Sequence, residues 1–465
     1  MAQPFDNAAT QNLAAISAIH QEQYFPNFER QYYMNGSLEA RIFSPADEAI
    51  VGDGKTLQVK VSRGDTMRPD TDVLSDIQQP RNFQANSIKV RWNERDQTAN
   101  DFVRIAGSAR VSQYDLDNGS EGNIASIAQE TYNDIVEGYG NQLAMLRHLG
   151  RTGTIATIVT SGKKNNDALT FAGATSYTTG STTCRIQIQS GPIAALQVGM
   201  VLDIYNGAVL VFSKAQVLDV NVTDNSVGLG RADTDSTANF DSVTSAYTLC
   251  LSGGYNKGIY SMGAWFGRPS STDSFIGGVN RFTSTSMSNY RWLLPTTVGE
   301  GETSTTIKRS DFDNAGDAIG FVGETTMAYV CLADAKMQTA LRQAIGNDSL
   351  IIQPQDAGNS ERFANFGSMG LHYQHPSLGR VVIASTPYAV PNTIRFMNPG
   401  DWKALSYGGK GLRFMPGEYG NWYRMQAATP NSGRGFYYQC DAFALVCDFC
   451  HNPRRQLQII NRTST

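Results

Sequence analysis

The sequence predicts an α+β protein in which an all-β block follows one long helix and precedes a mixed α/β region. Three observations predict this class. Residues 123–149 carry apolar side chains at helical spacing, and the chain before them is polar and extended. Residues 152–256 alternate apolar and polar positions between turn signals, which is typical of a small barrel or sandwich.

The long helix is the clearest single element. Its apolar positions recur every three or four residues, at Ile124, Ala128, Tyr132, Ile135, Tyr139, Leu143 and Leu146. At 1.5 Å per residue the segment would be about 40 Å long. Ser120 or Asn123 can cap its start, and Gly150 can end it. An ordinary core helix has the same spacing, so the neighbouring segments decide its role.

The chain before this helix lacks the apolar content of a domain core. Two short strands alternate apolar and polar residues at 57–61 and 88–92, and the stretch between them is polar with Pro69 and Pro80. A loop this long argues against a self-contained fold. We therefore expect residues 50–112 to form a long hairpin that lies on another molecule, and residues 1–49 to form an arm.

The block at 152–256 has strong hairpin signals. Cys184, Ile186 and Ile188 alternate with polar residues, and Asn206-Gly207 stands between two apolar runs. Strands at roughly ten-residue spacing favour a small barrel or sandwich.

Beyond Gly263 the pattern becomes mixed. We expect a buried strand at 327–333 and a helix at 335–345, capped by Asp334 and ended by Gly346. Strands at 381–384, 394–397, 412–415 and 435–449 should complete one sheet.

Composition sets broad limits. A chain of 465 residues should hold two to four domains. A net charge of -4 argues against a tight electrostatic hold on nucleic acid. No apolar run predicts a signal peptide or a membrane span, so we expect folding in the cytosol. Six irregularly spaced cysteines do not predict a disulfide framework.

The sequence Cys447 to His451 matches C-x-x-C-H, the attachment motif for c-type haem. Strand patterning over 435–449 would place Cys447 and Cys450 on opposite faces. The same difficulty applies to a zinc site made of Cys440, Cys447, Cys450 and His451. We expect buried small side chains here, with no cofactor and no metal.

The other motifs are weaker. His372 and His375 form H-x-x-H without a helix or a nearby Glu. Arg63-Gly64-Asp65 is a short match at the expected hairpin tip, and the glycines around Lys410 lack the first glycine of a phosphate loop. No catalytic constellation stands out, so we expect no enzyme.

The order of arm, polar hairpin, long helix, β block and α/β region resembles the HK97-fold major capsid proteins of tailed double-stranded DNA bacteriophages. The resemblance covers nearly the whole chain. It includes the strand–turn ASTPYAVPNT and Asn452-Pro453 followed by basic and β-forming residues.

The resemblance implies a division of the chain into named regions. These are an N-terminal arm (1–49), an E-loop hairpin (50–112), a spine helix with the P-domain (113–151), an inserted β domain (152–256), a continuation of the P-domain (257–320), and an A-domain with returning P-domain strands (321–465).

The resemblance also implies a function. The chain would self-assemble into hexamers and pentamers of an icosahedral head that encloses double-stranded DNA, in the virion, after assembly in the host cytoplasm. Its partners would be other copies, a separate scaffolding protein and a portal, with packaged DNA held weakly at the inner wall and no membrane. Whether a decoration protein binds is open.

Two alternatives stay open: an encapsulin-like nanocompartment shell, and a β-rich phage tail or carbohydrate-binding protein. The arm, hairpin and long helix favour a shell, since a binding module has no use for them. In a shell, we expect the hairpin arginines to face acidic groups of an adjacent subunit, namely Arg63, Arg68, Arg91 and Arg95.

Overall fold

The computed structural model describes residues 42–45, 56–60, 87–91, 102–112, 121–232, 239–244, 246–267, 275–276, 279–281, 293–319, 329–345, 371–375, 378–406, 412–414, 423–427 and 436–464. The chain divides into two compact units. The first comprises Met1–Thr56, Arg91–Ala144 and Ala404–Cys447, and the second comprises Leu57–Val90, Met145–Lys403 and Asp448–Thr465.

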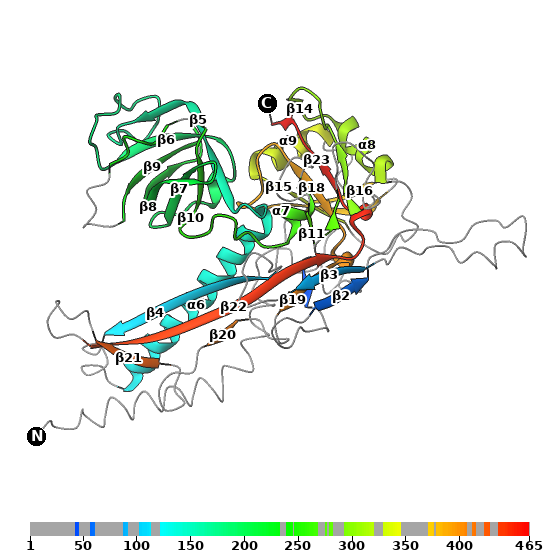
Figure 1. Cartoon of the computed structure of the whole chain (residues 1–465). Coiled ribbons are helices and arrows are strands. Elements are labelled where there is room, and N and C mark those ends of the chain that lie inside the picture. The colour runs from blue at the N-terminus through cyan, green and yellow to red at the C-terminus, as the bar shows by residue number, and fades with distance from the viewer. Residues whose placement is uncertain are drawn as a thin grey trace, which may run out of the picture. The chain divides into compact units, whose positions relative to one another are not determined.

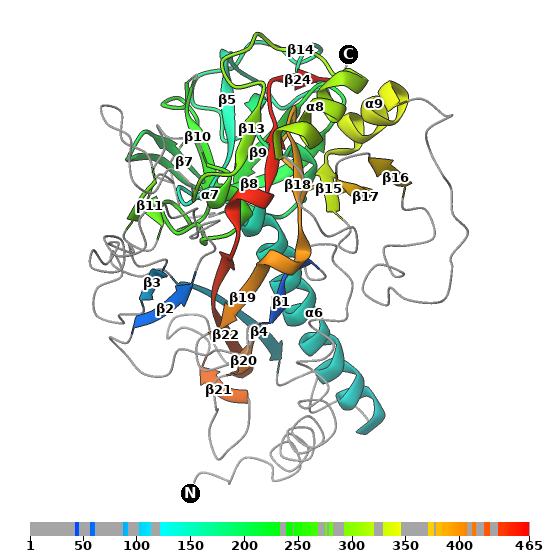
Figure 2. The same cartoon turned by 90° about the vertical axis from the view of Figure 1, so that its right-hand side faces the viewer.

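The predicted long helix is confirmed as α6, Glu121–His148, with 28 residues (Figure 1 and Figure 2). Along its second half Tyr139, Leu143 and Leu146 are buried, as their spacing predicts. Two basic residues, Arg147 and His148, occupy its last turn, where positive charge is favourable against the helix dipole. Among the described residues, no helix has both the length and the apolar character that crossing a membrane requires.

The longest strand is β22, Phe436–Cys450, with 15 residues. It pairs antiparallel with β4, Val103–Ser112, from Tyr437 opposite Ser112 to Val446 opposite Val103. The other strands of this sheet are β1 (Ser44–Pro45), β19 (Trp402–Ser406), β20 (Arg413–Phe414) and β21 (Tyr423–Ala427).

Residues 103–112, which belong to the segment expected to form the hairpin, form β4. The sheet corrects one expectation. Strands near 412–415 and 435–449 were expected to join those at 381–384 and 394–397, and that prediction is wrong because they belong to two different sheets. The reason is that β22 takes its partner from a segment more than three hundred residues earlier, which no local pattern reveals.

The two strands of the predicted hairpin do pair. They are β2, Thr56–Lys60, and β3, Ser87–Arg91, which form a two-stranded sheet.

Six antiparallel strands between residues 154 and 251 close into a barrel in the order β10-β5-β6-β9-β8-β7 (Figure 1). They are β5 (Thr154–Lys164), β6 (Cys184–Ser190), β7 (Val201–Asn206), β8 (Val209–Asn221), β9 (Ser226–Arg231) and β10 (Thr248–Leu251). The apolar side chains that alternate along these strands fill the interior, including Ile186, Ile204 and Leu229, each with no exposed surface. The predicted hairpin joins β7 to β8, where Asn206 lies opposite Val209 and Gly207 has a φ of 57°.

The two ends of the barrel segment lie side by side. The Asn256 amide donates to the Thr152 carbonyl at 2.9 Å, and the Gly258 amide donates to the Arg151 carbonyl at 3.0 Å. A Cβ on Gly258 would stand 2.1 Å from the Gly150 carbonyl oxygen, so only glycine allows this approach. The barrel therefore leaves and rejoins the chain at one place.

The second sheet of the second unit has six strands in the order β13-β23-β18-β15-β17-β16. They are β13 (Thr296–Val298), β15 (Tyr329–Ala333), β16 (Leu371–His375), β17 (Gly379–Ser385), β18 (Ile394–Met397) and β23 (Leu457–Ile459). The pairs β15–β17 and β13–β23 are parallel. Helices α8, Arg309–Ile319, and α9, Ala335–Ile345, contribute Phe312 and Leu341 to its core.

Short elements complete the described structure. They are the helices η3 (Ile193–Ala195), α7 (Met262–Trp265), η7 (Pro399–Asp401) and η9 (Pro453–Arg455), and the strand pairs β11 (Phe275–Ile276) with β12 (Val279–Asn280) and β14 (Thr305–Thr306) with β24 (Arg462–Thr463).

Candidate functional site

The hairpin arginines fall mostly outside the described residues. This applies to Arg63, Arg68 and Arg95, while Arg91 is the last residue of β3. Their contact with a neighbouring subunit therefore stays a prediction. The motif around Arg63-Gly64-Asp65 and the glycines around Lys410 also lie outside the described residues.

The C-x-x-C-H sequence lies at the end of β22. Cys447 and Cys450 are both buried and unoxidised, within a strand that ends at Cys450. Burial raises the pKa of the Cys450 thiol well above its usual value, so the thiolate that a metal or a haem attachment would need is disfavoured.

His375 of the H-x-x-H pair is a buried structural residue. The Leu378 amide donates to its Nδ1 at 3.2 Å, so the proton lies on Nε2, which donates to the Phe312 carbonyl at 3.2 Å. Burial lowers the pKa of the imidazole. Both nitrogens are thus occupied, and His375 has no free nitrogen for a metal.

A buried ion pair joins the end of α6 to the end of β22. Nε and Nη2 of Arg147 lie 2.7 Å and 3.2 Å from the two carboxylate oxygens of Asp448, and the Ser261 hydroxyl donates to the same carboxylate at 2.6 Å. The two charged side chains are only 4% and 1% exposed. This bidentate geometry offsets the cost of burying both charges.

Two further arginines tie the second unit together. Arg281 donates to the carbonyls of Trp265 at 2.7 Å and Ala264 at 2.8 Å, at the C-terminal end of α7. Arg462 of β24 contacts Glu302 at 2.6 Å and Asp311 at 2.9 Å. These arginines were not predicted. The signal available for Asp448 was a single acid within the apolar run FALVCDFC.

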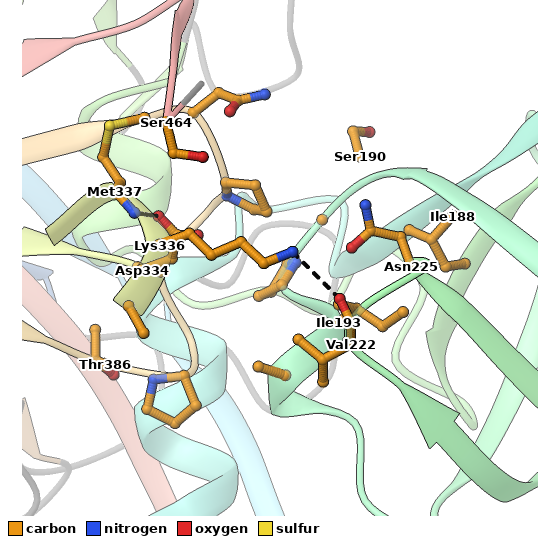
Figure 3. Close-up of a pocket in the computed structure, with 18 of the residues that line it drawn as sticks. Ile188, Ser190, Ile193, Val222, Asn225, Asp334, Lys336, Met337, Thr386 and Ser464 are labelled. Carbon is orange, nitrogen blue, oxygen red and sulfur yellow. Dashed lines mark hydrogen bonds between the residues drawn. The ribbon is translucent and has the colours of Figure 1, made fainter. Parts of the chain in front are cut away.

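A cavity of about 410 Å³ lies between the barrel and the mixed sheet (Figure 3). On one side it is lined by the end of β6 and by η3, and on the other by the start of α9 and the turn after β17. The Asp334 carboxylate accepts from the Met337 amide at 3.1 Å, and Lys336 Nζ reaches the Val222 carbonyl at 3.3 Å. Burial raises the pKa of Asp334.

Both charged side chains that line this cavity make contacts within the protein. Asp334 is used as a helix cap and Lys336 as a contact to the barrel. Within the described ranges no group of three or more His, Cys, Asp or Glu side chains could hold a metal ion.

No protein-family model matches the chain, and no curated protein matches it. Among solved structures, the procapsid of satellite phage P4 with its size determination (Sid) protein is similar over 100% of this chain and 98% of that chain, with 9% identity and a TM-score of 0.39. The capsid of cyanophage A-1(L) is similar over 91% and 92%, with 10% identity and a TM-score of 0.45. An encapsulin complex from Synechococcus elongatus is similar over 37% of this chain and 54% of that chain, with 13% identity and a TM-score of 0.22. The chain is similar to these two phage capsid structures over most of its length.

Proposed function

We propose that the chain is the major capsid protein of a double-stranded DNA phage. It self-assembles into hexamers and pentamers of an icosahedral head, and it resides in the virion after assembly in the host cytoplasm. Its function is the contact between copies, in which one surface is reused by symmetry.

The observation that carries this proposal is the β2–β3 pair. These strands form a two-stranded sheet of their own within the described residues, and residues 61–86 join them. An isolated two-stranded hairpin is marginally stable in water and needs a surface to pack against. A polar hairpin that reaches an adjacent subunit satisfies this need.

The regions of the HK97-like fold are assigned by proposal as well. Residues 1–49 are the arm and residues 50–112 are the E-loop, whose last part forms β4 in the sheet of β22. Helix α6 is the spine helix of the P-domain, the barrel is the inserted domain, and the six-stranded mixed sheet belongs to the A-domain. In this arrangement Arg63, Arg68, Arg91 and Arg95 face acidic groups of the neighbouring subunit.

The remaining partners follow from the same proposal. A separate scaffolding protein and a portal would bind the shell, and the binding of a decoration protein stays open. The net charge of -4 keeps packaged DNA weakly held, since few cations are available to replace its counterions.

Assembly is tested by electron microscopy and analytical ultracentrifugation of the full chain, alone and with the scaffolding protein. The informative variant carries Arg63→Glu and Arg68→Glu. We expect an unchanged circular dichroism spectrum of the subunit and a reduced yield of particles. Each interfacial ion pair that is lost costs about 2–5 kcal/mol if it is buried and about zero at a wet rim.

The matched control carries Lys257→Glu and Lys308→Glu, two exposed residues, and changes the net charge equally. Particle yield should stay near that of the unmodified chain. An equal loss in both variants would assign the effect to net charge alone. A subunit that unfolds in the arginine variant would place the hairpin in its own core and contradict the E-loop assignment.

A nanocompartment shell is the rival within the same class. Nuclease treatment of purified particles separates the two, because a phage head protects packaged DNA and a nanocompartment protects protein cargo.

A further inference from the structure

The two short turns η7 and η9 are joined by one buried amide. Gln456 has no exposed surface, and its Oε1 accepts from the Asn398 amide at 2.9 Å and from Trp402 Nε1 at 3.0 Å. Its Nε2 donates to Asp401 Oδ2 at 3.0 Å and to the Asn452 carbonyl at 3.2 Å. Every donor and acceptor of this side chain is in use, so it holds the two turns in one fixed geometry.

Asp401 is the titratable member of this cluster. It is the residue directly before β19, and its carbonyl accepts from the His451 amide at 2.8 Å, directly after β22. Since β19 and β22 are neighbours in one sheet, Asp401 stands at the base of that strand pair.

Few groups around the Asp401 carboxylate stabilise its negative charge. Gln456, a neutral amide, is its hydrogen-bond partner within the described residues, and Arg455 is the cation that faces it. Tyr329 of β15 and Cys450 of β22 face it without offering a charge. Asp448 differs, because a bidentate arginine and a hydroxyl compensate its buried charge.

Burial raises the pKa of Asp401 to about 6, and the charge of Arg455 and the hydrogen bond from Gln456 oppose this rise. The unfolded chain has the ordinary value of about 3.9. The folded state therefore binds the proton more tightly. This contribution to stability is fully present below the unfolded pKa, and it is lost as the pH rises through the folded pKa.

We propose that the Asp401–Gln456 cluster is a pH-dependent tie at the base of the β19–β22 pair, which tightens when the carboxylate takes up a proton at mildly acidic pH. The protonated carboxyl keeps an oxygen that can accept from Gln456, so the hydrogen-bond geometry survives while the cost of a partly buried charge disappears.

The test is urea unfolding of the full chain at about pH 5 and about pH 7.5, at one protein concentration, followed by tryptophan fluorescence. Trp402 is a direct reporter because its indole donates to Gln456. The Asp401 contribution should lower the unfolding equilibrium constant about tenfold at the acidic pH. Asp401→Asn should remove that difference and should be more stable than the unmodified chain at about pH 7.5.

The comparison between the two chains isolates Asp401. Other groups, such as His375 with its lowered pKa, contribute equally to both and cancel. Asp448→Asn is the matched control, and it should lose stability at both pH values while keeping the pH difference. If Asp401→Asn keeps the full difference, or if Asp448→Asn also abolishes it, the proposal is overturned.

A second variant keeps the test decisive if Asp401→Asn does not fold. Arg455→Gln removes the facing cation, so the midpoint of the pH dependence should move to a higher pH. A midpoint that stays in place in Arg455→Gln would contradict the assignment to Asp401.

Discussion

The barrel and the six-stranded mixed sheet, both in the second unit, differ in where their strands come from in the sequence and in how the strands pair. The six barrel strands follow one another within residues 154–251, and every pairing is antiparallel. The mixed sheet draws its strands from residues 296–459 and contains the parallel pairs β15–β17 and β13–β23. The barrel depends on neighbours in sequence, whereas the sheet depends on distant segments.

The largest expected effect tests this difference directly. A peptide of residues 152–256 should fold alone, because it contains all six strands of the barrel. Closure of the barrel also leaves no open strand edge. Deletion of residues 457–463 should prevent folding of the mixed sheet, because β23 lies inside it, between β13 and β18. Circular dichroism and amide dispersion in NMR spectra measure both outcomes. A disordered barrel peptide would show that the barrel needs the rest of the unit.

The next effect compares two ion pairs, one fully buried and one partly exposed. Asp448→Ala leaves Arg147 buried without its carboxylate and should cost about 3–5 kcal/mol of unfolding free energy. In the barrel, Arg185 pairs with Asp219, whose side chain is 28% exposed. Water can replace that carboxylate, and Ser226 still accepts from Arg185 at 2.9 Å, so Asp219→Ala should cost about 1–2 kcal/mol. Denaturant titrations of both variants decide this, and equal losses would contradict the comparison.

A smaller effect concerns α9, the second of the two helices that pack on the mixed sheet. Asp334→Ala removes the cap of α9 and should cost about 1 kcal/mol. Asp334→Asn is the matched control, since its amide oxygen can still accept from the Met337 amide. The melting temperatures of the two variants measure the effect, and identical values would mean that the cap does not contribute.

The smallest effect lies in α6, outside both regions. A Cβ on Gly138 would meet no described atom within 4 Å, so Gly138→Ala should add about 0.5–1 kcal/mol of stability to the isolated subunit. Thermal unfolding measures this gain. A stabilised subunit with a lower particle yield would indicate that a neighbouring copy packs against this face of the helix.

The elements that local signals define were predicted from the sequence. The helix at 335–345 and the strand at 394–397 match α9 and β18, and Asp334 caps α9 as expected. The hairpin after β7 closes one residue later than its Asn-Gly signal, with Gly207 and Ala208 in the loop.

The pairings between distant segments were not predicted. Residues 103–112 do alternate, at Val103, Ile105, Ala109 and Val111, but Gly107 interrupts the pattern and the partner strand begins at 436. In the sequence, Arg147 is a cation at a helix end and Asp448 is an isolated acid in an apolar run. Their contact arises only in the folded chain. The hairpin arginines stay a prediction, because their expected partners belong to another copy.

The position of β23 near the C-terminal end of the sequence determines the order in which the barrel and the mixed sheet can fold during synthesis. The ribosome releases residues 154–251 early, and at about 5–20 residues per second the barrel has many seconds to close before Leu457 appears. The mixed sheet, in contrast, waits with β13 and β18 unjoined until β23 is made. A truncated chain therefore presents a finished barrel beside an incomplete sheet with exposed strand edges, a state that chaperones and proteases can recognise before it joins other copies.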